Sequence, residues 1–395
     1  MVRSLNDKLS YIGVDDLRID LFESQYPVPE GISYNSYVLR AGKTAVFDTV
    51  DASASEQWKA NLSEALAGGM PDYLVIHHLE PDHSGLIGWM LETYPGMKAV
   101  LSVKAALMLP QFLDEGFSLE GRLLTVKDGD SLDLGGATLC FFTAPMVHWP
   151  EVTVSLWQEE GVLFSADAFG KFGALSKCGF RISDDADWTT QARRYYFNIV
   201  GKYGGPVKAL LAKLQGVDVK TICPLHGPVI DSGLEGCLSL YSGWSAYEPE
   251  EDGVLVACAS IHGGTMQAAE RLCALLSERG ARQVRLIDIC RCDLSEAVSE
   301  AFRYPAAVFA ASSYDASLFT PMHDFLHRLS TKGYCRRRAG IVENGSWAPS
   351  AGRVIRQMLS EMKDIELVEP VVTIRSRMKP SDEPVLAALA DAILG

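Results

Sequence analysis

The stretch Tyr73-Leu-Val-Ile-His-His-Leu-Glu-Pro-Asp-His-Ser-Gly85 joins a short apolar run to a dense group of possible metal ligands. The run YLVI is apolar and of strand length, and it predicts a buried β-strand. Four side chains that can bind a metal follow it within six residues: His78, Glu80, Asp82 and His83. A loop at the carboxyl end of a strand can turn such side chains toward one point. The stretch therefore predicts a metal site rather than an ordinary polar loop.

Three later strand-like runs each lead to one more candidate ligand. ATLCFFTAPMV precedes His148, GVLFSA precedes Asp167, and VKTICPL precedes His226. Any one of these residues alone would be read as structural. Together with the first group they supply four histidines, two aspartates and one glutamate, which suits two metals that share a bridging carboxylate. Three carboxylates favour iron or manganese, although this ligand set leaves zinc open.

The chain of 395 residues is long enough for two or three domains. An acidic seam with Pro and Gly, Ser245-Ala-Tyr-Glu-Pro-Glu-Glu-Asp-Gly253, separates two different patterns. Before it, short β-branched and aromatic runs alternate with a few helical stretches, among them 53–66 and 188–199, which predicts a layered α/β architecture. We place the domain boundary between residues 1–250 and 251–395.

After the seam, strands and helices alternate regularly. Five strand-like runs, VLVACAS, VRLIDI, AAVFAASS, AGIVEN and ELVEPVVTI, are separated by helical stretches. The predicted helices cover 266–279, 295–303, 322–331 and 353–363, and a last one ends the chain. This order predicts a doubly wound parallel sheet of five strands.

Three loops of this second domain are candidates for binding a ligand with a phosphate and a flat ring, an arrangement that resembles the binding of flavin mononucleotide (FMN) in flavodoxins. The first combines hydroxyls and glycines before a helix and contains no Lys or Arg, so it can hold a phosphate through backbone N–H groups but does not fit a P-loop nucleotidase. The other two follow the third and fourth strands, where aromatic residues can stack on a ring. The predicted residues are Ser260, Ile261, His262, Gly263, Gly264 and Thr265, then Ser312, Ser313, Tyr314, Asp315, Ala316 and Ser317, and then Asn344, Gly345, Ser346, Trp347 and Ala348.

The combined motifs resemble the flavodiiron proteins (A-type flavoproteins). The pattern His-x-His-x-Asp-His of the metallo-β-lactamase superfamily is present with Glu80 as its second member, and HWPE at 148–151, LFSADAFG at 163–170 and PLHGP at 224–228 are also similar to the family. The resemblance covers nearly the whole chain. It implies an α/β protein with an N-terminal metallo-β-lactamase-like αββα sandwich and a C-terminal flavodoxin-like doubly wound parallel five-stranded sheet.

The resemblance also implies an activity and a ligand set. It implies reduction of dioxygen to water, of nitric oxide to nitrous oxide, or of both, at a non-haem di-iron site supplied with electrons by FMN. It implies a head-to-tail homodimer, or a tetramer, and an external donor such as a rubredoxin, a reductase or a reduced deazaflavin. One iron would be held by His78, Glu80 and His148, the other by Asp82, His83 and His226, with Asp167 bridging.

The chain departs from the family near the site. Many members have Asn where His77 stands, Thr where Leu79 stands and His where Lys171 stands. Some members place a histidine of the N-terminal loop near the metals, where this chain has Ser24. Two tyrosines are candidate catalytic residues beside the metals: Tyr26 and Tyr195.

Composition excludes several classes of function. The formal net charge of −14 and the pI near 5.1 argue against binding to nucleic acid or to an anionic membrane. No apolar segment is long enough for a signal peptide or a transmembrane helix, and the nine cysteines contain no Cys-x-x-Cys pair, so we expect a cytoplasmic protein without a fused rubredoxin. Two alternatives stay open: a zinc hydrolase fused to a flavodoxin-like domain, and an electron carrier or sensor whose metal is only structural.

Overall fold

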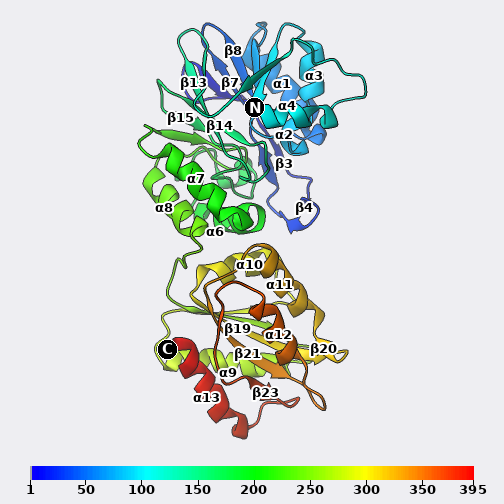
Figure 1. The fold of residues 1–395 in the computed structure, drawn as a ribbon, viewed down its shortest axis with the longest axis vertical. Coiled ribbons are helices and arrows are strands. Elements are labelled where there is room, and N and C mark those ends of the chain that lie inside the picture. Colours follow the sequence, from blue (N-terminus) through cyan, green and yellow to red (C-terminus); the bar gives the residue numbers. More distant parts are fainter. Residues whose placement is uncertain (1) are drawn as a thin grey trace. The chain divides into compact units, whose positions relative to one another are not determined.

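The computed structural model describes residues 2–395, which fold as two compact units (Figure 1). The N-terminal unit comprises the chain up to Tyr196 together with Gly205–Ser242, and the C-terminal unit comprises Phe197–Gly204 and Gly243–Gly395. The short segment Phe197–Gly204 therefore belongs to the second unit although it lies far from that unit in the sequence. None of the helices within residues 2–395 has both the length and the apolarity that crossing a bilayer requires.

The N-terminal unit is built on two facing β-sheets. The first sheet has the strand order β1 (Arg3–Ser4), β2 (Leu9–Tyr11), β7 (Tyr37–Arg40), β8 (Thr44–Phe47), β9 (Tyr73–Val75), β10 (Lys98–Ser102) and β11 (Leu123–Val126). The second has the order β12 (Ser131–Asp133), β13 (Thr138–Thr143), β14 (Thr153–Trp157), β15 (Val162–Phe164) and β16 (Thr221–Cys223). From β8 to β11 the first sheet is parallel, and β15 and β16 are parallel in the second.

The core of this unit lies between the two sheets. Phe47 and Val75 of the first sheet pack in one apolar cluster with Trp157 and Phe164 of the second. Phe47 stacks on Phe164 with ring centroids 3.9 Å apart. Helices flank the two sheets in Figure 1: α1 (Ser55–Leu66), α3 (Ile87–Thr93) and α4 (Val103–Met108) on one side, and α6 (Trp188–Tyr195), α7 (Gly204–Leu214) and α8 (Leu234–Ser245) on the other. This is the predicted αββα sandwich.

The C-terminal unit is a parallel sheet with helices on it. Its strand order is β18 (Val284–Asp288), β17 (Val254–Ala259), β19 (Ala306–Tyr314), β21 (Arg338–Asn344), and then β22 (Glu366–Leu367) and β23 (Val372–Ile374), which pair with different parts of β21. The strand β17 is buried at every position, as expected for the centre of a parallel sheet. The connecting helices are α9 (Gly264–Glu278), α10 (Leu294–Arg303), α11 (Thr320–Thr331), α12 (Ala351–Ser360) and α13 (Glu383–Leu394). The predicted fold class is confirmed for both units.

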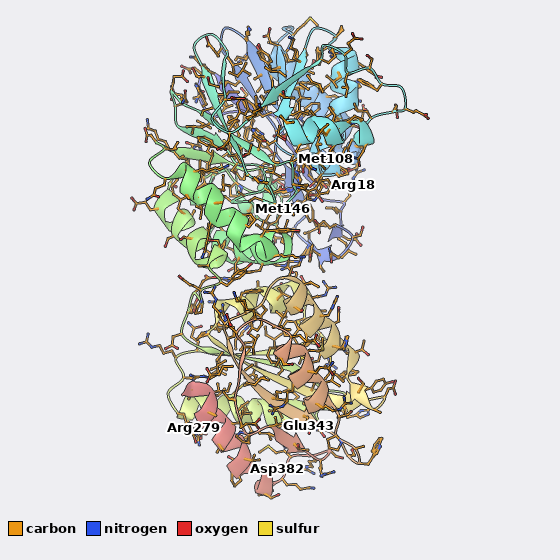
Figure 2. The ribbon with its side chains drawn as sticks, viewed as in Figure 1. Arg18, Met108, Met146, Arg279, Glu343 and Asp382 are labelled. Carbon is orange, nitrogen blue, oxygen red and sulfur yellow. The ribbon has the colours of Figure 1, made fainter. Side chains whose placement is uncertain are left out.

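Two predicted elements differ from the structure. The run ELVEPVVTI forms two short strands rather than one, because Pro370 between them has no N–H to donate to the sheet. The helix predicted over 188–199 is α-helical only as α6, and the chain continues in a π-helical turn, Tyr196–Val200. Side-chain orientation throughout both units is drawn in Figure 2.

Candidate functional site

The seven predicted metal ligands come from the carboxyl ends of four strands. His78 and Glu80 lie in the loop after β9, and Asp82 and His83 lie on the short helix α2 (Pro81–Ser84) that follows. His148 follows β13, Asp167 follows β15, and His226 follows β16. Glu80 is the N-cap of α2 and Pro81 its first residue, a position where the missing N–H of proline costs nothing. The turn therefore places two ligands before α2 and two on it.

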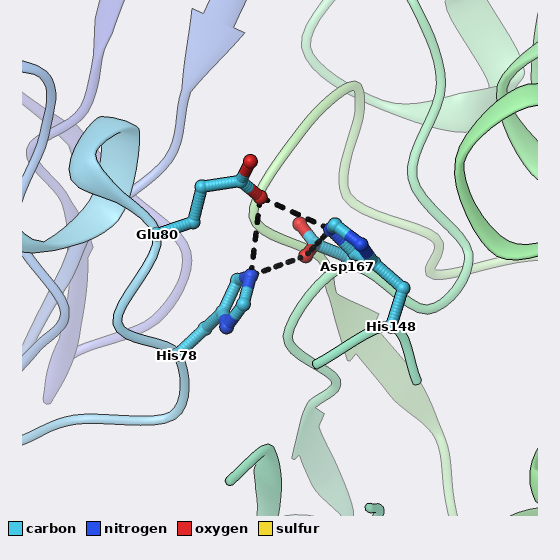
Figure 3. Close-up of side chains that lie close together, drawn as sticks. All are labelled: His78, Glu80, His148 and Asp167. Atoms are coloured by element: carbon cyan, nitrogen blue, oxygen red, sulfur yellow. Dashed lines mark hydrogen bonds and ion pairs between the residues drawn. The ribbon is translucent and has the colours of Figure 1, made fainter. Parts of the chain in front are cut away.

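The first group of ligand atoms surrounds one point. The Nε2 atom of His78 lies 3.2 Å from Oε2 of Glu80, and Nε2 of His148 lies 3.0 Å from the same oxygen. Oδ2 of Asp167 is 3.3 Å from both imidazole nitrogens. Figure 3 shows these four side chains pointing toward one another. All four ligand atoms lie within 4.8 Å of each other, a spacing that could hold a metal ion.

The second group lies beside it and is made by Asp82, His83 and His226. Oδ2 of Asp82 is 3.3 Å from Nε2 of His83 and 3.2 Å from Nε2 of His226. The two imidazole nitrogens face each other at 3.1 Å. Both rings are buried, so neither nitrogen can form a hydrogen bond with bulk water.

Asp167 lies between the two groups. Its Oδ2 faces His78 and His148, while its Oδ1 is 3.4 Å from Nε2 of His83 and 3.7 Å from Nε2 of His226. The carboxylate is fully buried. This is the arrangement in which one carboxylate can contribute an oxygen to each of two cations.

Outer partners orient two of the imidazoles. Nδ1 of His78 lies 2.8 Å from Oε1 of Glu151, which also accepts a hydrogen bond from the backbone N–H of Leu79 at 3.0 Å. Nδ1 of His226 donates to the carbonyl oxygen of Ser33 at 2.7 Å. Each bond keeps the proton on Nδ1 and leaves Nε2 free to face the ligand cluster. Sequence reasoning missed Glu151 although it stands three residues after His148.

The protonation of the metal-free cluster follows from its crowded carboxylates. Burial lowers the pKa of His148, but the carboxylates of Asp167 and Glu80, which lie 3.3 and 3.0 Å from its Nε2 atom, outweigh burial and raise that pKa to about 9. Burial raises the pKa of Glu80, but hydrogen bonds from His148 and His78 outweigh it and lower that pKa to about 2. Without a cation, protonated imidazoles therefore balance the carboxylates. Metal binding must displace those protons.

A further, independent observation indicates that these residues fit a metal. Both side-chain oxygens of Asp82 and both of Asp167 are buried without a hydrogen-bond partner. A buried carboxylate without hydrogen bonds costs several kcal/mol unless a cation or a proton compensates it. The donor set of imidazoles and carboxylates is that of transition-metal sites in proteins.

The candidate catalytic tyrosines differ in their distance from the ligands. The Tyr195 ring is 5.6 Å from that of His226, and its buried hydroxyl has no hydrogen-bond partner. Burial, and then the charges of the neighbouring carboxylates, raise the pKa of that hydroxyl well above its ordinary value, so it remains protonated. Tyr26 is also buried and packs on Phe172, which in turn packs on Tyr195. Phe22, which sequence reasoning missed, packs edge-on against His226 at 5.3 Å.

Ser24 is exposed, so the N-terminal loop reaches the ligands through Phe22 instead. His77 points away from the ligand cluster and bridges Oδ2 of Asp48 and Oγ of Ser155, at 2.6 and 2.8 Å. Lys171 is buried and forms an ion pair with Asp185, whose side chain is also buried.

A pocket of about 910 Å³ opens at the carboxyl ends of the strands of the C-terminal unit. The predicted flavin residues line it, except Ser317, which pairs in the short strand β20 (Ser317–Leu318). Trp347 is 89% exposed at its rim, free to stack on a flat ring. Sequence reasoning missed three lining residues: Gln267, Ser376 and Arg377. The last two follow β23, which ends at Ile374 as predicted, but only the fold brings them to the pocket.

Comparisons with known proteins agree with the fold of both units. The family model described as "ODP family beta lactamase" matches residues 32–227, which include all seven candidate metal ligands. The anaerobic nitric oxide reductase flavorubredoxin of Enterobacter sp. (strain 638) is 25% identical over 385 residues, covering 95% of this chain and 77% of that protein. The protein of the same name from Aliivibrio fischeri is 26% identical over 392 residues, covering 97% and 77%.

Solved structures show the same fold. The rubredoxin oxygen:oxidoreductase of the anaerobe Desulfovibrio gigas superposes with a TM-score of 0.92 at 24% identity, covering 100% of this chain and 98% of that one. The flavodiiron protein of Giardia intestinalis superposes with a TM-score of 0.89 at 22% identity, covering 99% and 96%.

Proposed function

This chain belongs to the flavodiiron protein family, and on that premise we propose that it reduces dioxygen, nitric oxide or both at a di-iron centre that receives electrons from FMN. The observation that carries the proposal is the position of Asp167. Its two oxygens face two separate groups of ligands, which is the requirement for a binuclear centre. The two relatives named nitric oxide reductases and the one named an oxygen oxidoreductase support both gases.

The proposed ligand sets follow the two groups. His78, Glu80 and His148 would hold one iron, Asp82, His83 and His226 would hold the other, and Asp167 would bind both. Three carboxylates among seven ligands favour iron over zinc, because hard oxygen donors suit the higher oxidation state that redox chemistry needs. Glu151 and the carbonyl of Ser33 would hold the rings of His78 and His226 in place.

The metals and the flavin, when bound, would supply electrons to the gas. The protein residues around them then have separate tasks. Tyr195, whose ring lies beside that of His226, would hold a proton on its buried hydroxyl. Phe22 would exclude water from the side of His226, and Tyr26 would support that apolar wall through Phe172. Excluding water strengthens the electrostatic interactions inside the site.

The FMN would occupy the pocket of the C-terminal unit. Backbone N–H groups of Gly263, Gly264 and Thr265 lie at the start of α9, where the helix dipole favours a phosphate. Tyr314 and Trp347 are exposed at the pocket rim and can cover a ring. A volume of about 910 Å³ is ample for one flavin mononucleotide.

The assembly and the electron donor are proposals of the same kind. The resemblance implies a head-to-tail homodimer, or a tetramer, in which the flavin of one subunit serves the metals of its partner. The exposed aromatic rim of the flavin pocket is the kind of surface such a contact would cover. A separate rubredoxin, a reductase or a reduced deazaflavin would supply the electrons, and a cytoplasmic location would suit these donors.

The test is to quantify iron, zinc and FMN in the purified protein and to measure gas consumption after anaerobic reduction. We expect iron at both positions, bound FMN, and consumption of dioxygen, nitric oxide or both. Asp167→Ala should abolish consumption, whereas the matched surface variant Asp218→Asn should keep it. Zinc with hydrolysis of a lactam, thioester or phosphodiester would establish the hydrolase alternative, and bound flavin without gas consumption would establish an electron carrier.

A further inference from the structure

The flavin pocket contains a single permanent cation. Its lining includes one arginine, Arg377, and no lysine, and the other titratable side chains there are His262 and Asp315. The phosphate-loop candidate, Ser260–Thr265, has no Lys or Arg of its own. Arg377 is exposed, and within residues 2–395 its guanidinium has no carboxylate at ion-pair distance. An unpaired cation is therefore available to an anionic ligand in an otherwise acidic protein.

The segment that carries Arg377 is fixed against the phosphate-loop candidate. A Cβ atom added to Gly264 would lie only 2.1 Å from the carbonyl oxygen of Ser376, so the two backbones are in close contact. Asn344 holds Ser376 by two hydrogen bonds, accepting from its N–H at 2.9 Å and donating to its carbonyl at 3.0 Å. The hydroxyls of Ser346 and Ser376 are 2.5 Å apart. The backbone just before Arg377 therefore lies against the amino end of α9.

We propose that Arg377 binds the phosphate of the flavin and makes this pocket select FMN over riboflavin. The inference rests on the proposed function and adds a specificity-determining residue to it. A phosphate monoester carries between one and two negative charges at neutral pH. The amino end of α9 supplies only a partial positive charge, whereas a guanidinium supplies a full one with planar donors that match phosphate oxygens. Asp315, on the turn between β19 and β20, follows a different strand from the loop of Gly264.

The experiment is a fluorescence titration of the flavin-free full-length protein with FMN and, separately, with riboflavin. Arg377→Gln removes the charge, and Arg375→Gln is the matched control, since Arg375 is exposed two residues away but does not line the pocket. We expect Arg377→Gln to weaken FMN binding about tenfold or more, the range for loss of a charge-assisted hydrogen bond. Riboflavin binding should change by less than about twofold, and the control should leave both unchanged.

Salt gives a second readout. FMN binding to the wild-type protein should weaken as salt rises, and Arg377→Gln should show a smaller salt dependence, because one screened charge pair is gone. An equal loss of FMN and riboflavin in Arg377→Gln would overturn the inference by placing the guanidinium against the ring. Unchanged FMN affinity would overturn it by showing that the loop alone holds the phosphate. Failure of the wild-type protein to bind either flavin would overturn the proposed function together with it.

Discussion

The carboxylate of Glu151 should control metal affinity without touching a metal. It is buried, and its Oε1 faces Nδ1 of His78 at 2.8 Å and accepts from the N–H of Leu79 at 3.0 Å. A buried anion at this position orients the imidazole and makes Nε2 a better donor to a cation. Glu151→Gln keeps an oxygen for both hydrogen bonds and removes the charge alone. Glu151→Ala removes the acceptor as well.

The structure allows the effect of losing the charge to be separated from the effect of losing the hydrogen-bond acceptor. A hydrogen bond to a charged group contributes about 1.5–3 kcal/mol and a neutral one about 0.5–1.5 kcal/mol, so Gln should cost about 1–1.5 kcal/mol of metal binding. This corresponds to about a tenfold weaker affinity. Ala should weaken metal binding by up to about a hundredfold. Because it also leaves the buried N–H of Leu79 without an acceptor, Ala should lower the free energy of unfolding by a further ~1–3 kcal/mol.

The assay is an anaerobic titration of the metal-free protein with ferrous iron in competition with a coloured chelator. Chemical unfolding of the metal-free protein gives the stability. Glu160→Gln, which changes an exposed carboxylate in the turn between β14 and β15, is the matched control and should change neither quantity. Wild-type affinity in both Glu151 variants would refute the reasoning, because it would show that His78 needs no outer partner.

Three further outcomes are expected. Lys171→Met should lower the free energy of unfolding by about 3–5 kcal/mol, because it leaves the buried carboxylate of Asp185 without its ion-pair partner. In a double-mutant cycle, adding Asp185→Asn should recover part of this loss. Equal stability of the single variant and the wild type would contradict the ion pair. Ferrous iron should bind the metal-free protein more tightly as pH rises toward about 9, because the raised pKa of His148 makes a proton compete with the metal below that value. Calorimetry in buffers of different ionisation enthalpy should detect the release of protons on binding. An affinity that does not change with pH would contradict this competition. Tyr195→Phe should leave the stability of the metal-free protein unchanged or slightly higher, because the buried hydroxyl of Tyr195 has no hydrogen-bond partner to lose. The same variant should consume gas more slowly. Unchanged gas consumption would remove Tyr195 from the proposed mechanism.

Much of the candidate site follows from short-range pattern. The apolar run before His78 and the runs before Asp167 and His226 predict strands, and parallel strands present their carboxyl ends at one edge. The phosphate-loop candidate is predicted in the same way from a strand followed by glycines and a helix. Local sequence is informative here because strand and helix periodicity depends on neighbouring residues.

The parts that the sequence did not predict depend on pairs of distant segments. Nothing near His78 in the chain indicates that Glu151 is its hydrogen-bond partner, because the two residues are 73 positions apart and meet only when two sheets pack. Phe22 reaches His226 through the tertiary fold in the same manner. Arg377 stands just after the predicted end of the fifth strand at Ile374, and only the tertiary fold brings the neighbouring Ser376 against Gly264.

The sequence by itself predicted the types of the candidate ligands, their places at strand ends, the two-part architecture and a phosphate-loop candidate without a cation. Only the tertiary structure decided which oxygen of Asp167 faces which group of ligands, and which cation lies beside the loop of Gly264. The physical reason is that strand periodicity is a property of a few consecutive residues. The direction of a buried carboxylate, in contrast, is set by the charges and hydrogen-bond donors that packing brings to it from the rest of the chain.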